Sequence, residues 1–211
     1  MTFEKSISIT NPRLLVVEGK DECLFFQALL TKLKLPNIQI ISYDGKAKLR
    51  DFIGALIVTP GYSDVTILGI SRDADENPQT AYQSVMDALR RYNLALPEKP
   101  LMIAGDKPRI IVMILPDENT QGMLEDLCLR TVKNDNSMKC VDAFFNCLCA
   151  KHIPLPRNMS KAKVHAFLAS RREADKRLGE AAQAGYWQFG SQSLKQAKDF
   201  LRSIAKSKPP K

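Results

Sequence analysis

The amino-acid sequence predicts an α/β fold, with a mostly parallel, Rossmann-like sheet, an antiparallel hairpin at one edge and a C-terminal helical extension. Three apolar segments, residues 14–17, 38–43 and 65–70, are each followed by a stretch whose apolar residues recur at helical spacing. Three strand–helix units in about 80 residues are typical of a doubly wound parallel sheet. The length of 211 residues leaves room for one such domain and an appendage.

The first strand–helix unit organises the rest of the chain. Residues 14–17 are Leu-Leu-Val-Val, which is typical of a strand that is buried on both faces. Glu18 stands at the carboxyl end of this strand, where ligands bind in open α/β sheets. We expect Gly19 to adopt backbone dihedrals that other residues avoid, and residues 20–33 to form an amphipathic helix.

Two further strand–helix units follow. Residues 38–43 predict a strand that ends at a turn, and residues 46–56 predict a second amphipathic helix. Residues 65–70 predict the third strand. A helix then runs to residue 91, because Asn77 is a good N-cap and Pro78 suits the first helical turn.

The pattern changes after residue 100. Residues 101–104 and 109–115 are apolar runs joined by Gly-Asp-Lys-Pro, which predicts an antiparallel hairpin. Helical spacing then predicts five helices, over residues 123–132, 141–151, 161–172, 178–184 and 193–205. The predicted organisation is an α/β domain over residues 1–120, a helical extension over 121–205 that packs on the same core, and a disordered tail over 206–211.

The positive charge is concentrated in the last quarter of the chain. Residues 157–211 hold 13 basic and 4 acidic residues, a balance of +9, whereas residues 1–156 hold 18 basic and 19 acidic residues. Such asymmetry indicates a nucleic-acid or other anionic partner. The alternative is that lysines on exposed faces only keep the protein in solution.

The sequence has no features typical of a membrane or secreted protein. No apolar run of about 18 residues predicts a transmembrane helix, and residues 1–5 lack the apolar segment of a signal peptide. Five cysteines without secretory context are typical of reduced thiols, so we expect a cytoplasmic protein with no membrane partner. The sequence leaves open a homodimer or a partner protein.

Acidic residues follow two of the predicted strands. Glu18 follows the first strand, and Asp73 and Asp75 follow the third, where an extended backbone would project both to the same side. If the two strands are neighbours, the carboxylates meet, and a hard cation such as Mg²⁺ would neutralise them. The structural alternative is that Asp75 caps a helix and that Glu18 forms an ion pair with Lys20 or Arg72.

These residues resemble the motifs of the Toprim domain. The resemblance rests on Glu18-Gly19 after one strand and Asp73-x-Asp75 after a later one, and it covers roughly residues 12–120. Toprim domains occur in topoisomerases, primases, RNA-maturing nucleases, recombination proteins and OLD-type nucleases of phage defence. The whole chain looks similar to uncharacterised stand-alone Toprim-like proteins of prokaryotes and their viruses.

The resemblance implies Mg²⁺- or Mn²⁺-dependent phosphoryl transfer. Glu18 would be a general acid/base or metal ligand, Gly19 would keep the backbone clear beside it, and Asp73 and Asp75 would bind the metal. Lys20 and Arg72 are additional candidates, because Arg72 would bind phosphate or replace part of the metal's charge. The chain lacks the third acid of topoisomerase-like members and the glycine of primase-like members, which argues against both activities.

Four further acids have competing interpretations. OLD-type nucleases use acids beyond the core three, so Glu125 and Asp126 are candidates, although we favour their being exposed residues near the start of a helix. Asp21 and Glu22 fall in the first turn of helix 20–33. We interpret both as residues that complement the helix dipole.

Two clusters outside the acids favour structural roles. Cys140, Cys147 and Cys149 contain no Cys-x-x-Cys pair, so we interpret them as core thiols rather than zinc ligands. Trp187 and its aromatic neighbours could stack on bases, but we favour a hydrophobic anchor that docks the C-terminal helices on the sheet.

Three functions therefore remain open. The first is an Mg²⁺-dependent nuclease of Toprim type, in which the basic C-terminal region holds the nucleic-acid backbone. The second is a non-catalytic Toprim-like module that binds nucleic acid or a partner protein. The third is a receiver-like domain that is phosphorylated at Asp73. We rank it last, because residues 115–117 lack the lysine that receiver domains have after a final parallel strand.

Overall fold

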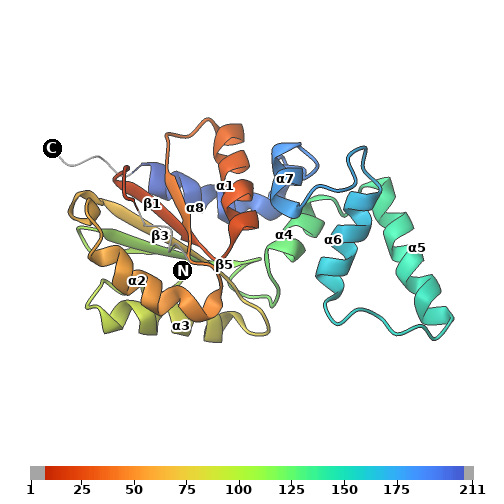
Figure 1. Ribbon diagram of the computed structural model, residues 1–211, viewed down its shortest axis with the longest axis horizontal. Helices are drawn as coiled ribbons and strands as arrows, with labels where there is room; N and C mark the ends of the chain where they lie inside the picture. Colours follow the sequence, from red (N-terminus) through yellow and green to blue (C-terminus); the bar gives the residue numbers. More distant parts are fainter. Residues whose placement is uncertain (1–7, 207–211) are drawn as a thin grey trace, which may run out of the picture.

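The computed structural model describes residues 8–206, and its centre is a five-stranded sheet with the strand order β2-β1-β3-β5-β4 (Figure 1). Strands β2, β1, β3 and β5 are parallel, and β4 pairs antiparallel with β5 at one edge. The predicted α/β class, parallel sheet and antiparallel edge are therefore confirmed. The strands are β1 (Arg13–Val17), β2 (Gln39–Ser42), β3 (Ile67–Asp73), β4 (Ile103–Ala104) and β5 (Arg109–Leu115).

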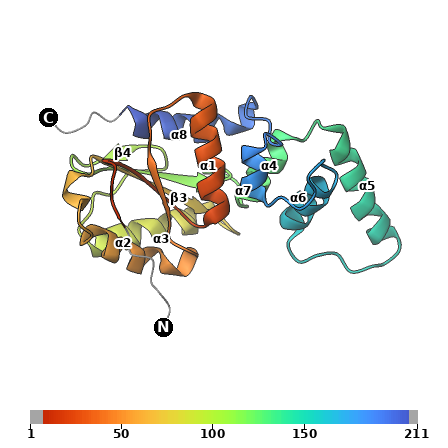
Figure 2. The same cartoon turned by 45° about the horizontal axis from the view of Figure 1, so that its top comes forward.

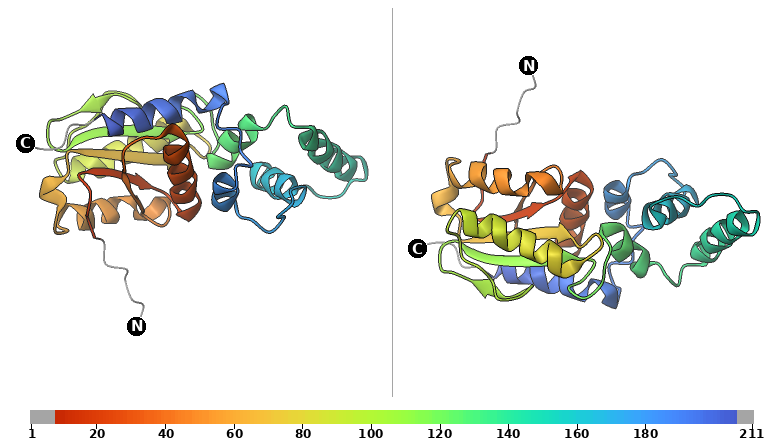
Figure 3. Two further views of the ribbon diagram at one scale, coloured as in Figure 1. Left: turned by 90° about the horizontal axis from the view of Figure 1, so that it is seen from above. Right: turned by 90° about the horizontal axis from the view of Figure 1, so that it is seen from below.

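Helices cover both faces of the sheet. Helices α1 and α8 lie on one face and α2 and α3 on the other, so the α/β part has three layers (Figure 3). The helices are α1 (Lys20–Leu33), α2 (Leu49–Ile57), α3 (Pro78–Arg91), α4 (Leu124–Thr131), α5 (Asn136–Ala150), α6 (Met159–Ala169), α7 (Leu178–Gln183) and α8 (Lys195–Ala205).

Strand β1 shows why the sheet needs helices on both sides. Leu15 and Val17 join the core under α1 and α8, whereas Leu14 and Val16 join the core under α2 and α3. All four side chains have no exposed surface. Alternate residues of a strand face opposite sides, so an unbroken apolar run needs an apolar layer on each side.

Most predicted elements lie close to their expected positions, with two instructive differences. Strand β3 continues to Asp73 rather than ending at residue 70, because it remains paired with β5 up to the pair Asp73 and Leu115. Helix α5 begins at Asn136, five residues before the predicted start. Asp135 is its N-cap, since its side chain accepts a hydrogen bond of 2.8 Å from the backbone N–H of Ser137.

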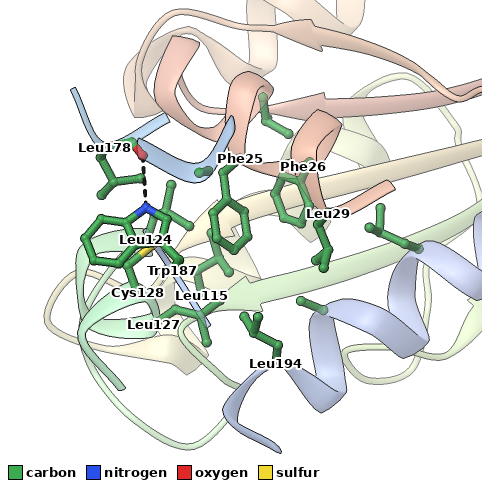
Figure 4. Close-up of a cluster of buried hydrophobic side chains, with 14 of the residues drawn as sticks. Phe25, Phe26, Leu29, Leu115, Leu124, Leu127, Cys128, Leu178, Trp187 and Leu194 are labelled. Atoms are coloured by element: carbon green, nitrogen blue, oxygen red, sulfur yellow. Dashed lines mark hydrogen bonds between the residues drawn. The ribbon is translucent and has the colours of Figure 1, made fainter. Parts of the chain in front are cut away.

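Helices α4 and α7 lie beside the sheet, and α5 and α6 lie beyond them at one end of the molecule (Figure 2). Trp187 joins this region to the sheet (Figure 4). Its indole N–H donates a 3.0 Å hydrogen bond to the carbonyl of Leu178, and its ring stacks on Phe167 with the centroids 5.3 Å apart. The interpretation of Trp187 as a hydrophobic anchor is confirmed.

Helix α8 belongs to the α/β core although it comes last in the described chain. A Cβ added to Gly69, in the middle of β3, would lie 2.4 Å from Cδ1 of Ile204 and 3.1 Å from Cζ of Phe200. Glycine therefore lets α8 approach the strand this closely. One hydrophobic core thus contains residues from both sides of residue 120. The predicted tail falls on residues 207–211, outside the described part, apart from Lys206.

The prediction that Cys140, Cys147 and Cys149 are core thiols is wrong, because all three are exposed on α5. The buried cysteine is Cys128, on α4. Helix α5 packs against α6 at the end of the molecule. Across residues 8–206, no helix is long and apolar enough to span a membrane.

Candidate functional site

The candidate site lies at the edge where β1 and β3 end at their carboxyl termini, which we term the carboxyl edge. Strands β1 and β3 are parallel neighbours, with Val16 opposite Ile70. Glu18, which follows β1, and Asp73, the last residue of β3, therefore reach the same edge. The adjacency on which the sequence prediction depended is present in the structure.

Glu18 is a carboxylate with few partners. Its Oε1 accepts a 3.2 Å hydrogen bond from the backbone N–H of Lys46, and Nη1 of Arg72 lies 3.8 Å from its Oε2. Oε2 is buried and accepts no hydrogen bond from any residue that the structure describes. Burial raises the pKa of Glu18, although the positive charge of Arg72 opposes the increase.

Asp73 lies on the opposite side of β3 from Arg72, next to the N-terminus of α4. Its Oδ1 accepts a 3.1 Å hydrogen bond from the backbone N–H of Leu124, the first residue of that helix. Burial raises its pKa well above the usual value, and the charges of Glu22 and Glu18 raise it further. Asp73 is therefore a carboxylate whose ionisation calls for a nearby positive charge.

Asp75 does not share the orientation predicted for it. The chain leaves the extended conformation after β3, and Asp75 has a φ of 51°. Its backbone pairs with that of Gly122, and its side chain forms a 2.9 Å ion pair with Lys46. The expectation that an extended backbone projects Asp73 and Asp75 to the same side is wrong, because the turn at Asp75 intervenes.

Glu22 is the acidic residue whose burial the sequence interpretation did not anticipate. It lies in the first turn of α1, yet only 7% of its surface is exposed, so it does more than complement the helix dipole. Burial raises its pKa to about 7, helped by the charges of Glu18 and Glu125. The sequence contained a signal for this burial in the spacing of the two acids. Glu22 follows Glu18 by about one helical turn, and side chains in the first turn of a helix point back toward the end of the preceding strand.

Gly19 matters for a reason other than the predicted one. Its φ of −146° is extended backbone that any residue adopts, so the expectation of special dihedrals is wrong. A Cβ at this position would instead lie 3.0 Å from Oε2 of Glu22. Gly19 therefore leaves space for the Glu22 carboxylate to fold back against the backbone.

Glu125 and Asp126 separate into two roles. Asp126 is structural, since it accepts hydrogen bonds from the backbone N–H of Met123 (2.9 Å) and from the hydroxyl of Ser160 (2.6 Å). Glu125 has a side chain that is only 18% exposed, and Nζ of Lys161 lies 3.9 Å from it. Burial raises the pKa of Glu125. The preferred interpretation of Glu125 as an exposed helix residue is therefore wrong.

Four carboxylates from four segments of the chain lie near the carboxyl edge and influence one another electrostatically, since the charges of Glu18 and Glu125 raise the pKa values of both Glu22 and Asp73. We call them the acidic cluster: Glu18, Glu22, Asp73 and Glu125. Each has a pKa raised mainly by burial. Lys20, at the start of α1, is exposed and forms no ion pair with the described residues. Asp21 accepts a 2.9 Å hydrogen bond from the backbone N–H of Gly179 and so joins α1 to α7.

The acidic cluster consists of the hard oxygen donors that Mg²⁺ prefers. As the side chains stand, however, no group of three or more His, Cys, Asp or Glu in residues 8–206 is arranged to hold a metal ion. Oε2 of Glu18 accepts no hydrogen bond from the described residues, and burial raises the pKa values of the cluster although Arg72 lies 3.8 Å from Glu18 and Lys161 lies 3.9 Å from Glu125. These residues fit a divalent cation in chemistry, and their side chains would have to rotate toward it.

Comparisons with known proteins identify a family but no activity. The family model described as "Protein of unknown function (DUF3226)" matches residues 12–206. A hypothetical protein from Pyrococcus horikoshii OT3 has a similar fold, with a TM-score of 0.59 and 17% sequence identity over 91% of this chain and 94% of that one. A search of curated proteins finds no match.

Proposed function

Since the chain belongs to the DUF3226 family of proteins of unknown function, its activity has to be inferred from its own site, and we propose that it is a divalent-cation-dependent enzyme of phosphoryl transfer on nucleic acid. The proposed reaction is hydrolysis of a phosphodiester, as in a Toprim-type nuclease. The observation that carries the proposal is the acidic cluster at the carboxyl edge, where open α/β sheets bind their ligands.

The electrostatics of the cluster support a cation there. Carboxylates that are buried together cannot all ionise unless a positive charge lies among them. Arg72 is one source of such charge, but it lies beside Glu18 and on the other side of β3 from Asp73. We propose that Glu18, Glu22 and Asp73 hold Mg²⁺ or Mn²⁺, with Glu125 beside them. When bound, such an ion supplies charge stabilisation for a phosphoryl group.

The residues of the chain would divide the remaining work. Glu18 has a carboxylate oxygen without a hydrogen bond and a raised pKa, so it suits a general acid/base that exchanges a proton with water or the leaving oxygen. The N-terminus of α4 already donates to Asp73 and would hold that carboxylate in place. The same assignment of Glu18 and Asp73 follows from the Toprim resemblance, whereas Asp75 would have to leave Lys46 to take part.

Cation binding is the first test, because it does not depend on knowing the substrate. Thermal unfolding of the full chain in EDTA is compared with unfolding in excess Mn²⁺ or Mg²⁺. A cation at about 100 times its Kd stabilises the folded state by about 2.7 kcal/mol, or roughly 5–10 °C for a chain of this size. We expect Glu18→Gln and Asp73→Asn to reduce this shift. The control Glu98→Gln removes an exposed loop carboxylate and should keep it.

Cleavage is the second test. Wild-type protein should cut single-stranded or plasmid DNA, or RNA, with Mn²⁺ or Mg²⁺ but not in EDTA. The cleavage rates of Glu18→Gln and Asp73→Asn should each be at least 100-fold lower than that of the wild type. Equal cleavage by the wild type and both variants would show that a contaminant or another site is responsible. Absence of any cation-induced shift in the wild type would contradict the metal site itself.

The second candidate is a non-catalytic module that binds nucleic acid or a partner protein. It is favoured by the positive charges that already lie beside two of the predicted ligands, Lys46 at Asp75 and Arg72 at Glu18. In this case nucleic-acid binding would survive Asp73→Asn and would be indifferent to EDTA. The cation-induced shift distinguishes the two candidates without a substrate.

A further inference from the structure

A positively charged cavity adjoins the acidic cluster on the α2/α3 face of the sheet. The cavity has a volume of about 450 Å³ and lies between the start of α2, the end of β3 and the C-terminal half of α3. Four of its lining residues are basic, and we call it the basic pocket: Lys46, Arg50, Arg72 and Arg91. The other polar residues that line it are Ser84 and Asp87.

Asp87, the acidic residue that lines the pocket, already has hydrogen-bond partners. Oδ1 of Asp87 accepts hydrogen bonds from Nη1 of Arg90 (2.6 Å) and Nε2 of Gln83 (2.8 Å), both on α3. Arg50 and Arg91 are exposed, and neither forms an ion pair with any residue between positions 8 and 206. The pocket therefore presents two guanidinium groups without a counter-charge.

Arg72 connects the basic pocket with the acidic cluster. It lines the pocket, and only 10% of its side chain is exposed, yet its Nη1 lies 3.8 Å from Glu18 and 3.5 Å from the carbonyl of Lys46. Its Nε is buried and donates to no acceptor in the described part of the chain. A buried guanidinium with an unused donor calls for a further acceptor at this position.

We infer that the basic pocket binds a phosphate group and holds it beside the acidic cluster. Guanidinium forks match the geometry of phosphate oxygens, and several of them around one cavity favour a dianion or a chain of phosphodiesters over a carboxylate. Arg50 and Arg91 would form the outer contacts, and Arg72 would form the inner one. This inference adds to the proposed function by placing the phosphate-binding surface in residues 46–91 rather than in the basic C-terminal region.

The ion pairs of the C-terminal region support that placement. Five of its basic residues already have acidic partners in the structure. Three of these pairs, those of Lys161, Lys163 and Arg171, reach acidic residues outside 157–211 and so use part of the charge excess of that region. Arg50 and Arg91, in contrast, form no ion pair with the residues that the structure describes. The five basic residues are Lys161, Lys163, Arg171, Lys176 and Arg202.

Nucleic-acid binding measured without a metal tests this inference separately from the proposed enzymatic activity. Fluorescence anisotropy of a labelled single-stranded oligonucleotide is measured in EDTA, with pyrophosphate and a mononucleotide as competitors. We expect Arg50→Gln/Arg91→Gln to raise Kd at least tenfold and to lower the slope of log Kd against log salt by about one to two. The control Arg157→Gln/Lys195→Gln removes two exposed charges from the C-terminal region and should change Kd less than threefold.

Each outcome has a definite meaning. Strong competition by the mononucleotide would identify a free nucleotide as the source of the phosphate, and weak competition would identify the nucleic-acid backbone; both support a phosphate pocket. Equal weakening in both double variants, or in neither, would overturn the inference. Normal binding by Glu18→Gln together with lost cleavage would show that the pocket works while the acidic cluster carries the reaction. If Glu18→Gln loses cleavage while Arg50→Gln/Arg91→Gln binds the oligonucleotide normally, the basic pocket is rejected and the proposed enzymatic activity is retained.

Discussion

At the residue scale, Glu22 is the clearest case of a side chain whose burial conflicts with its charge. The helix places it over the end of β1, where Gly19 leaves room for its carboxylate. Its pKa of about 7 lies above the 4.5 of an ordinary glutamate. The protonated form therefore contributes stability below pH 4.5, and this contribution is lost as the pH rises through 7.

Glu22→Gln should stabilise the metal-free protein at pH 8. The substitution removes a buried charge, and a shift from 4.5 to about 7 sets an upper limit of about 3 kcal/mol on the gain. Chemical denaturation in EDTA measures it, and the gain should shrink toward pH 4.5. With Mn²⁺ present the order should reverse, because the wild type alone keeps the full set of proposed ligands. An unchanged order with Mn²⁺ would exclude Glu22 as a ligand.

Gly19→Ala tests whether the Glu22 carboxylate needs the space above Gly19. Since the backbone there is extended, the cost should come only from the 3.0 Å approach to Oε2 of Glu22, and we expect about 1 kcal/mol. In a Glu22→Ala background the same substitution should cost close to nothing. Urea denaturation of the four proteins gives the coupling energy. A cost that persists without Glu22 would mean that the backbone itself requires glycine.

At the element scale, Asp135 fixes the position of α5. It caps that helix through the backbone N–H of Ser137 and forms a 3.0 Å ion pair with Arg171, which follows α6. The hydrogen bonds from Arg171 and Ser137 lower the pKa of Asp135. Because the folded-state pKa is lowered, this contribution is present above pH 3.8 and is lost as the pH falls below it.

Asp135→Ala should destabilise the protein by about 1–2 kcal/mol at pH 7. The difference from the wild type should be smaller at pH 3 than at pH 7, because the wild type loses the contribution of the Asp135 charge as the pH falls below 3.8. Asp135→Asn is the matched control, since asparagine keeps the cap and removes only the charge, so it should cost less. Urea titrations at the two pH values measure both effects. A penalty that is the same at pH 3 and pH 7 would mean that the charge of Asp135 contributes nothing.

The same scale shows what a sequence can predict about this site. The apolar run 14–17 and the mostly apolar third strand predicted two buried parallel strands. Their adjacency, which brings Glu18 and Asp73 to one edge, was only a condition of the sequence prediction, and the structure supplies it. The turn at Asp75 could not be predicted, because it depends on a backbone pair with the distant Gly122. The basic pocket was also out of reach, since Arg50 and Arg91 meet only after α2 and α3 pack together.

At the scale of the whole molecule, the C-terminal region cannot be treated as a removable appendage. Trp187, Phe200 and Ile204 all lie in the core that also holds β1 and α1. Deletion of residues 157–211 would therefore expose one face of the sheet. Loss of nucleic-acid binding in such a truncated chain would say nothing about its basic residues, which is why point substitutions are needed.

Deletion of α8 alone should abolish cooperative folding. A chain that ends at residue 194 would lose Phe200, Leu201 and Ile204, which are fully buried. Burial of three such side chains is worth roughly 5–9 kcal/mol, comparable with the whole stability of a domain. We expect binding of a hydrophobic dye and a broad thermal transition, in contrast to the full chain. A sharp transition close to that of the full chain would show that α8 is dispensable.

The contact of α8 with β3 also has a consequence for biosynthesis. Gly69 leaves the ribosome more than a hundred residues before Ile204, the residue that covers it. At about 5–20 residues per second, that face of the sheet remains without α8 for roughly 7–27 s. Until then the nascent polypeptide displays an apolar surface, which makes it a substrate for chaperones that bind at the exit tunnel.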